Sequence, residues 1–153
     1  KKQLIKPDIQ ANFWNGDPDI DAVCRMIFKP ECNFKKNIFP FFSKKISPFN
    51  SQNTLIGRKV IKDYFLFPHI GRMDDIWASF YVTSKKYRVI YNEPTVYQQR
   101  NVHNLIKDFK DEYIGYVNSL NLVESLYKNS ENITKFLPKK SSLAFDEWKK
   151  LIK

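Results

Sequence analysis

Residues 47–77 read SPFNSQNTLIGRKVIKDYFLFPHIGRMDDIW, and this stretch decides how we interpret the chain. It opens with polar residues on backbone that Pro48 keeps irregular, bends again at Pro68 and Gly71, and ends in two carboxylates at the start of a helical pattern. Amides, hydroxyls and paired carboxylates are costly to bury, but they hydrogen-bond well to a polyhydroxylated ligand. The stretch therefore predicts a sugar-handling site. Its candidate residues are Asn50, Ser51, Gln52, Asn53, Asp74 and Asp75.

The two adjacent carboxylates, Asp74 and Asp75, allow three interpretations. Together they can bind a divalent cation, or one can act as a general base while backbone N–H groups hold the other. In the third interpretation both only cap the helix that follows. Two neighbours bear on the choice, because Arg72 suits a phosphate or a sugar hydroxyl, and Trp77 either stacks on a pyranose ring or fills the core.

Two further polar clusters lie outside this stretch. The first is Asp17, Asp19 and Asp21, which either cap a helix near Pro18 or resemble the start of a calcium loop, although the glycine and the closing glutamate of an EF-hand are missing. The second runs through residues 97–103 and includes Arg100 and His103. A lone His at the start of a helix is typically a cap, but this cluster can also ligate a metal or contact a diphosphate.

Length and composition indicate one folded domain with no membrane span. The chain has 153 residues, 42% of them hydrophobic and 16% aromatic, which is enough to bury a core. Its two cysteines have no metal-site spacing and predict reduced thiols. No apolar run approaches the ~18 residues of a transmembrane helix, and nothing resembles a signal peptide. We therefore expect a cytoplasmic protein, and because the chain begins with Lys1 we treat it as a candidate piece of a longer one.

The net charge of +10 first points to nucleic acid. The lysines, however, occur as scattered pairs, and no nucleic-acid-binding motif is present. We therefore expect solvated lysines, with an anionic ligand as the alternative, and no nucleic-acid partner. The sequence also lacks a nucleophile elbow, a P-loop, a GxGxxG and a CxxC, so it gives no support to hydrolase triads, kinases or Rossmann dehydrogenases.

Hydrophobic periodicity predicts an α/β chain. Residues 1–16 are expected to form a loop or short strand, and residues 28–47 an extended, loop-rich segment. Strands are expected at 48–57, 87–91 and 95–98. Helices are expected at 18–27, 58–65, 74–85, from 102 to about 116, 118–128 and 141–153, with a polar linker between the last two.

Four motifs in this order resemble the STELLO-type proteins: DPDIDAVCRM (17–26), PFNSQNTLIGR (48–58), GRMDDIWASF (71–80) and PTVYQQRNVHNLIKDFKDE (94–112). They are similar, more distantly, to the reversibly glycosylated polypeptides, the UDP-arabinopyranose mutases. Both groups are related to GT-A glycosyltransferases. The similarity covers roughly residues 15–116, about two-thirds of the chain.

The resemblance implies a fold and a set of roles. Residues 1–116 would be the acceptor-side, C-terminal half of a GT-A-like domain, with a short mixed sheet and flanking helices, followed by a helical extension at 117–153. Asp75, with Asp74 beside it, would be the catalytic base under the acceptor. Residues 49–57 would line the donor sugar, and His103 would be a metal ligand. Asp17, Asp19 and Asp21 match a motif that follows the nucleotide-binding half.

The implied partners are a nucleotide-sugar and a glycan acceptor. We assign substrate binding to residues 50–53 together with Arg72, Trp77 and Arg100. A divalent metal, Mn²⁺ or Mg²⁺, is expected only with the complete protein, because the alternating β/α half that ends in the DxD metal motif is not found before Asp17. The alternative function is a non-catalytic carbohydrate- or polyanion-binding module.

Overall fold

The computed structural model describes residues 6–35 and 38–152 of the chain. Its strands are β1 (Ile9–Gly16), β2 (Phe41–Phe42), β3 (Thr54–Ile56) and β4 (Val89–Gln98). Its α-helices are α1 (Ala22–Ile27), α2 (Asp74–Ser84), α3 (Leu105–Lys128) and α4 (Lys139–Leu151). Short 3₁₀ turns form η2 (Arg58–Val60), η3 (Gly71–Met73) and η4 (Ser130–Lys135).

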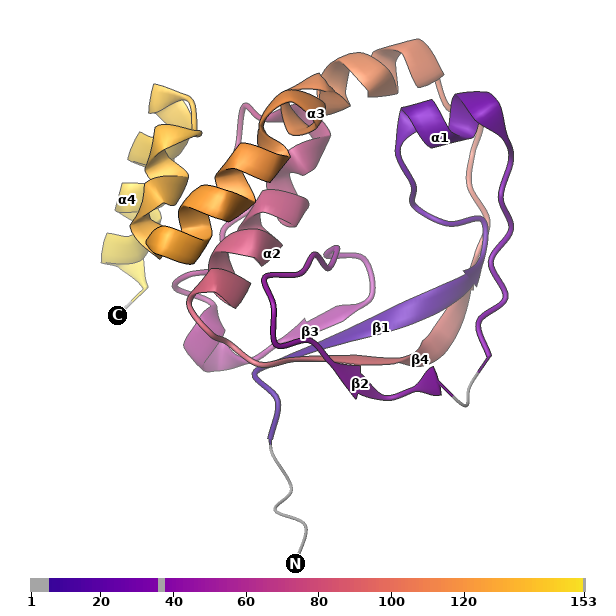
Figure 1. Cartoon of the computed structure of the whole chain (residues 1–153), viewed down its shortest axis with the longest axis horizontal. Helices are drawn as coiled ribbons and strands as arrows, with labels where there is room; N and C mark the ends of the chain where they lie inside the picture. The colour runs from indigo at the N-terminus through magenta and orange to yellow at the C-terminus, as the bar shows by residue number, and fades with distance from the viewer. Residues whose placement is uncertain (1–5, 36–37, 153) are drawn as a thin grey trace, which may run out of the picture.

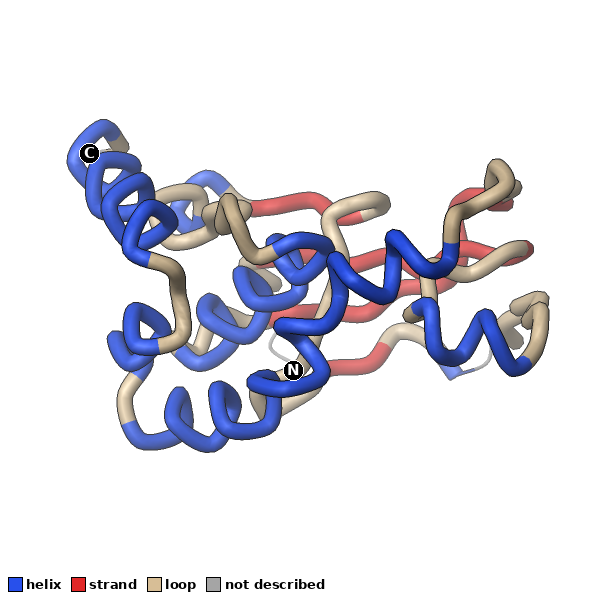
Figure 2. The backbone as a smooth tube through the Cα atoms, turned by 90° about the horizontal axis from the view of Figure 1, so that it is seen from above, coloured by secondary structure: helices blue, strands red, loops and turns tan. Residues whose placement is uncertain are grey.

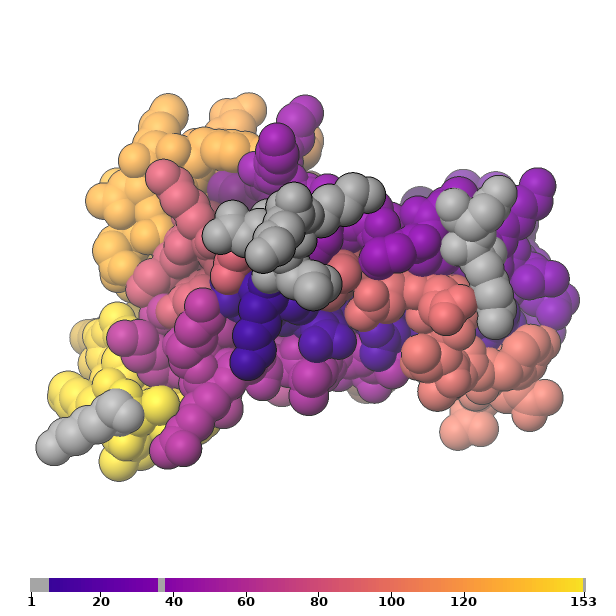
Figure 3. Space-filling view, turned by 90° about the horizontal axis from the view of Figure 1, so that it is seen from below, coloured from indigo at the N-terminus to yellow at the C-terminus, as the bar shows by residue number. Residues whose placement is uncertain are grey.

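The strands form one mixed sheet in the order β2-β4-β1-β3. β1 and β4 are parallel, whereas β3 pairs with β1 and β2 pairs with β4 in the antiparallel sense. The helices lie on one side of this sheet, with α4 at one end (Figures 1 and 2). Seen from below, α4 (yellow) lies away from the start of β1 (indigo) near the centre (Figure 3). The α/β class, the short mixed sheet and the C-terminal helix are therefore confirmed.

β4 is longer than the two strands predicted from its sequence. Residues 89–91 and 95–98 of the two predicted strands belong to one ten-residue strand that continues through Pro94 and begins two residues later than expected. A proline cannot donate to a ladder, so it is tolerated in a strand where the pairing is irregular. Such an irregularity is present, because the β1–β4 register shifts between Asn12 and Trp14. Two steps along β1, from Asn12 to Trp14, pair with four steps along β4, from Asn92 to Val96, so the extra residues lie in β4 around Pro94.

Three helix predictions need correction. The helices expected on either side of residue 117 are a single helix, α3, of 24 residues. The helix expected at 58–65 is only the 3₁₀ turn η2, followed by irregular backbone. α1 begins at Ala22 rather than near residue 18, because Asp21 is its N-cap and accepts a hydrogen bond from the Cys24 amide at 2.9 Å.

One hydrophobic core joins both parts of the chain. It contains Trp77, Tyr81 and Phe67 together with Leu122 and Phe145 from α3 and α4, all of them fully buried. The boundary expected between residues 116 and 117 therefore falls inside α3, and the helical extension contributes to the same core. In the part of the chain that the structure describes, no helix is both long and apolar enough to cross a membrane.

The loop-rich segment before β3 is held to the sheet by aromatic contacts. Phe41 stacks on Tyr91 with ring centroids 4.9 Å apart, and Phe13 packs against Phe34 and Phe39 at 4.7 and 5.2 Å. These contacts explain why a segment without clear periodicity carries so many phenylalanines.

Candidate functional site

A polar cleft of about 540 Å³ opens where four segments meet. They are the β1–α1 connection, the turn before β3, the η3–α2 junction and the β4–α3 connection. The cleft is lined by Asp19, Ser51, Gln52, Arg72, Asp74, Asp75, Gln98, Gln99, Arg100, Asn101, Val102 and His103. Eight of the residues predicted from sequence thus lie together: Asp19, Ser51, Gln52, Arg72, Asp74, Asp75, Arg100 and His103.

Asp75 is the carboxylate most closely tied to the amide-rich turn. Its Oδ2 atom accepts hydrogen bonds from the Ser51 amide at 2.8 Å and the Ser51 hydroxyl at 3.1 Å. Burial raises the pKa of Asp75 above its ordinary value; the Ser51 hydrogen bonds oppose this, and the charges of Asp74 and Asp19 add to it. Asp75 is therefore a better proton acceptor than a free carboxylate would be.

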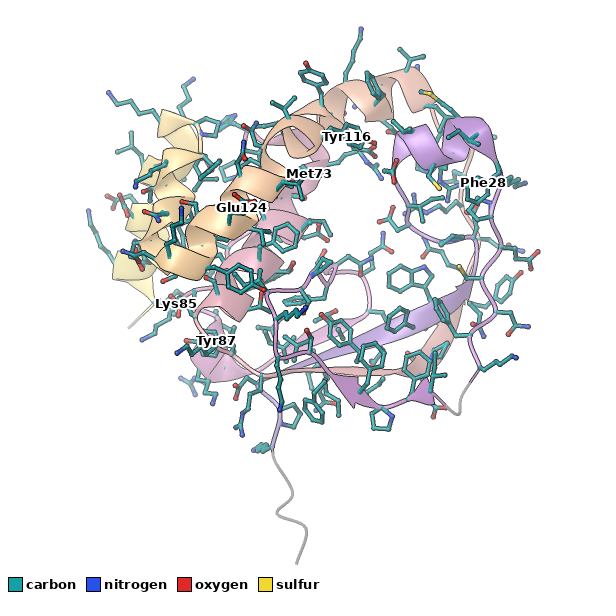
Figure 4. The ribbon with its side chains drawn as sticks, viewed as in Figure 1. Phe28, Met73, Lys85, Tyr87, Tyr116 and Glu124 are labelled. Atoms are coloured by element: carbon teal, nitrogen blue, oxygen red, sulfur yellow. The ribbon has the colours of Figure 1, made fainter. Side chains whose placement is uncertain are left out.

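Close packing of η3 on α3 fixes where these carboxylates lie. Gly71 has a φ of +61°, and a Cβ there would overlap the Asp111 carbonyl oxygen. In return, a Cβ on Gly115 would overlap the Sδ atom of Met73, which lies against α3 (Figure 4). Gly71 therefore allows a close approach of η3 to the backbone of α3, while Gly115 leaves room for the Met73 side chain, and both contacts set the start of α2.

Arg72 connects the cleft to the helix behind it. Its Nε donates to Glu112 Oε1 at 2.9 Å, while its other nitrogens lie 3.3 Å from Asp19 Oδ1 and 3.6 Å from Asp108 Oδ1. Burial lowers the pKa of Arg72, but the three carboxylates outweigh it and raise that pKa overall. Arg72 is thus a fixed cation whose charge is compensated on three sides.

Glu112 is a buried carboxylate in this network. It is 2% exposed, and its Oε2 accepts from the Ala22 amide and from the Tyr116 hydroxyl, both at 2.7 Å. Through these bonds it joins the first turn of α1 to α3 and to Arg72. The sequence analysis did not single out Glu112, although a glutamate on the core side of a helix is itself a signal of a buried ion pair.

Arg100 and Asp19 form an ion pair that lines the cleft. The Arg100 guanidinium pairs with Asp19 Oδ1, and its side chain is only 8% exposed. Gln52 Nε2 donates to Asp19 Oδ2 at 2.9 Å. The Nε of Arg100 is buried and has no hydrogen-bond partner among the described residues. This leaves one oriented donor next to the cleft.

The expected metal ligand His103 lines the cleft but is engaged elsewhere. Its Nδ1 lies 3.0 Å from Asp108 Oδ2. Within residues 6–35 and 38–152, no group of three or more His, Cys, Asp or Glu side chains is placed to hold a metal ion. The role of His103 as a metal ligand therefore stays a prediction.

Five predicted residues lie outside the cleft. Trp77 is fully buried, and its Nε1 donates to Ser119 Oγ at 3.0 Å, so its expected stacking on a sugar is wrong. Asp17 pairs with Arg25, and Asp21 caps α1. Both therefore have structural roles.

Asn53 and Asn50 support the turn from other sides. Asn53 Nδ2 donates to Phe13 O at 3.0 Å and to Thr95 Oγ1 at 2.8 Å, which ties the turn to β1 and β4. Asn50 Oδ1 accepts from the Gln52 amide at 3.3 Å. The expected direct contact of these two asparagines with a ligand in the cleft is not supported, because neither lines it.

The connection between β4 and α3 contributes more than its two predicted residues. Gln98, Gln99, Asn101 and Val102 also line the cleft. The polarity of this stretch was visible in the sequence, but its position opposite Asp75 depends on the parallel pairing of β4 with β1.

No protein-family model and no curated protein matches this chain. The likeness to GT-A-related proteins therefore rests on the four sequence motifs alone.

Proposed function

We propose that this chain is the acceptor-side part of a nucleotide-sugar-dependent glycosyltransferase, in which Asp75 takes the proton from an acceptor hydroxyl. The observation that carries the proposal is the pair of Ser51–Asp75 hydrogen bonds, because they bring the acidic turn and the amide-rich segment to one cleft. A general base works best when its pKa approaches the working pH, and the pKa of Asp75 is shifted in that direction.

The charges of the cleft suit a neutral, hydroxylated ligand. Asp19, Asp74 and Asp75 offer acceptors to hydroxyl groups, while Arg72 and Arg100 offer donors. A bare diphosphate would meet three carboxylates here, which argues that this cleft is the acceptor side. A divalent metal with the complete protein would neutralise the departing diphosphate; the described residues supply the acceptor contacts and the base.

The proposal is tested in two steps on the present chain and on the full-length gene product. First, ¹H–¹⁵N spectra of this chain are titrated with a panel of neutral oligosaccharides, and we expect shifts at the amides of Ser51, Gln52 and Asp75. Second, turnover of UDP-sugars with Mn²⁺ is measured on the full-length protein. Asp75→Asn should abolish turnover and leave the fold intact.

Asp146→Asn is the matched control, because Asp146 lies on α4 with a side chain that is 52% exposed. It should change neither binding nor turnover. If no saccharide shifts the cleft amides and the full-length protein is inactive with every donor, the proposal fails.

A second candidate, a polyanion-binding module, is favoured by a different surface. A pocket of about 430 Å³ beside β2 is lined by Lys44, Lys45, Lys86 and Arg88, and by no carboxylate. Arg88 also faces Asp8 at 3.6 Å. This function predicts heparin binding without nucleotide or metal that weakens with salt. Lys44→Ala with Lys45→Ala should reduce it, whereas Asp75→Asn should not.

A further inference from the structure

A second, apolar cavity of about 280 Å³ lies next to the polar cleft. It is lined by Ala11, Asn12, Phe13, Trp14, Pro48, Phe49, Asn50, Thr54, Ile76 and Tyr91, none of which is charged. Both Phe13 and Trp14 line the cavity, next to the point where the β1–β4 register shifts and β4 has extra residues. The result is an aromatic wall on the helix side of the sheet.

The cavity and the cleft share one dividing wall. Asn50 and Ile76 line the cavity, while their chain neighbours Ser51 and Asp75 line the cleft. The Ser51–Asp75 hydrogen bonds join the two sides of this wall. The Thr54 hydroxyl stabilises the turn by donating a hydrogen bond to Asn50 O at 2.7 Å. A single ligand that spans the wall would therefore meet carboxylates at one end and aromatic rings at the other.

One hydrogen-bond donor that lines the apolar cavity has no partner among the described residues. The Nε1–H of Trp14 is buried and has no hydrogen-bond acceptor among the described residues. Other polar groups around the cavity are satisfied: the Tyr91 hydroxyl lies 2.9 Å from both Ser47 Oγ and Pro48 O, and Asn12 Oδ1 accepts from Asn92 at 2.9 Å. A buried donor without an acceptor costs free energy, so an unpaired one marks a place where a ligand atom can bind.

We propose that this cavity binds an uncharged ring that carries one hydrogen-bond acceptor and is attached to the hydroxylated ligand of the cleft. The ligand class is thus a glycoside or polyol with an aryl or alicyclic substituent. An apolar cavity of ~150 Å³ is known to hold benzene, so about 280 Å³ accommodates one substituted ring. The part of the proposal that concerns the attached hydroxylated group rests on the proposed function.

The test compares three probes that differ only in the group offered to the cavity: methyl, phenyl and p-nitrophenyl glycosides of the same sugars. Affinity is measured by calorimetry and by quenching of tryptophan fluorescence. We expect the p-nitrophenyl glycoside to bind at least ~10-fold more tightly than the methyl glycoside and to quench Trp14, since the nitro oxygens can accept its N–H.

Three variants test the N–H group of Trp14, the specificity of its fluorescence and the cavity itself. Trp14→Phe keeps an aromatic wall but removes the donor, so it should weaken the p-nitrophenyl glycoside about 10-fold and change the phenyl and methyl glycosides little. Trp148→Phe is the control, because its Nε1 already donates to Ile61 O at 3.0 Å. This variant should lower total fluorescence and keep the ligand-induced quenching. Ala11→Leu fills the cavity and should abolish the preference for aryl groups, with thermal unfolding as the check on its fold.

The outcomes distinguish this inference from the proposed function. Equal binding of aryl and methyl glycosides, with Trp14 unaffected, overturns the inference and leaves the proposed function standing. Binding of free p-nitrophenol at Trp14 would support a ring-binding cavity. If no glycoside changes the cleft amides in the same experiment, the result contradicts the proposed function. Absence of binding by all probes overturns the inference, and the proposed function fails with it only if the full-length protein is also inactive with every donor.

Discussion

Asp75 Oδ2 accepts two hydrogen bonds from Ser51, one from its backbone amide at 2.8 Å and one from its hydroxyl at 3.1 Å. These bonds connect the first turn of α2 with a turn 24 residues earlier in the chain. The carboxylate is therefore oriented in the absence of any ligand, and its second oxygen is left to interact with whatever enters the cleft.

The raised pKa of Asp75 makes protein stability depend on pH in a defined direction. Because the folded state holds this proton more tightly than the unfolded state, the free energy of unfolding falls as the pH rises through the ordinary value of 3.8 and above. Asp75→Asn should therefore be more stable than the native protein at pH 7, by at most about 1 kcal/mol because solvent screens a partly exposed group.

Urea unfolding at several pH values measures this difference. The gain should vanish near pH ~3, where the native carboxyl is itself protonated. Asp146→Asn, on the exposed surface of α4, should show no such pH dependence. A loss of stability at pH 7 would mean that the charge of Asp75 anchors the Ser51 turn.

Glu112→Gln should be strongly destabilising. The substitution removes one of the negative charges that compensate the Arg72 guanidinium. It also puts an amide NH₂ group, which is a donor, where Glu112 now accepts three hydrogen bonds. The donors of these bonds are Arg72 Nε, the Ala22 amide and the Tyr116 hydroxyl. Disrupting a buried ion pair of this kind costs about 3–5 kcal/mol. The comparison is Glu124→Gln on the same helix (Figure 4), an exposed position where the change should stay within ~0.5 kcal/mol. Equal midpoints of denaturation for the two variants would contradict the role given to Glu112.

The sequence located the acidic turn and the amide-rich turn because both depend on local chemistry. Prolines, glycines and short polar side chains define irregular backbone without reference to the rest of the fold, and this holds for residues 47–77. The strand β4 and the start of α2 at Asp74 were predictable within a few residues for the same reason.

What the sequence could not give depends on contacts between distant segments. Trp77 was a candidate for either the core or a ligand, and only the packing of α2 on α3 decides for the core, with Ser119 as the partner of its indole nitrogen. Glu112 and the exposed Glu124 both lie on α3, and the difference between them is which face of the helix meets Arg72 and α1. The boundary expected at 116–117 falls inside α3, and Leu122 and Leu126, which follow it, belong to the same buried core as α2.

The contact between Gly115 and Met73 reverses an ordinary rule of helix propensity. Glycine to alanine inside a helix normally stabilises it by about 1 kcal/mol. Gly115→Ala should instead cost about 1–3 kcal/mol, because the added methyl overlaps the Met73 side chain. Asn121→Ala, at an exposed position of the same helix, should instead stabilise the protein, as a change to alanine normally does inside a helix. In a Met73→Ala background most of the cost of Gly115→Ala should disappear, and a cost that persists there would place the strain elsewhere.

Tyr87 should control part of the loss of stability at alkaline pH. Burial, together with a 2.7 Å hydrogen bond to the Asp63 carboxylate and the charge of that group, raises the pKa of Tyr87 to about 12. Lys85 donates to the other oxygen of Asp63 at 2.7 Å, and the Lys85 and Tyr87 side chains lie near the end of α2 (Figure 4). The unfolded tyrosine loses its proton near pH 10, so the stabilisation is complete below that pH and is lost as the pH rises through 12.

Tyr87→Phe should cost about 1–2 kcal/mol at pH 7, and its stability should fall less steeply than that of the native protein between those two pH values. Denaturant unfolding at pH 8 to 12 measures both curves; parallel curves would show that Asp63 does not hold the Tyr87 proton.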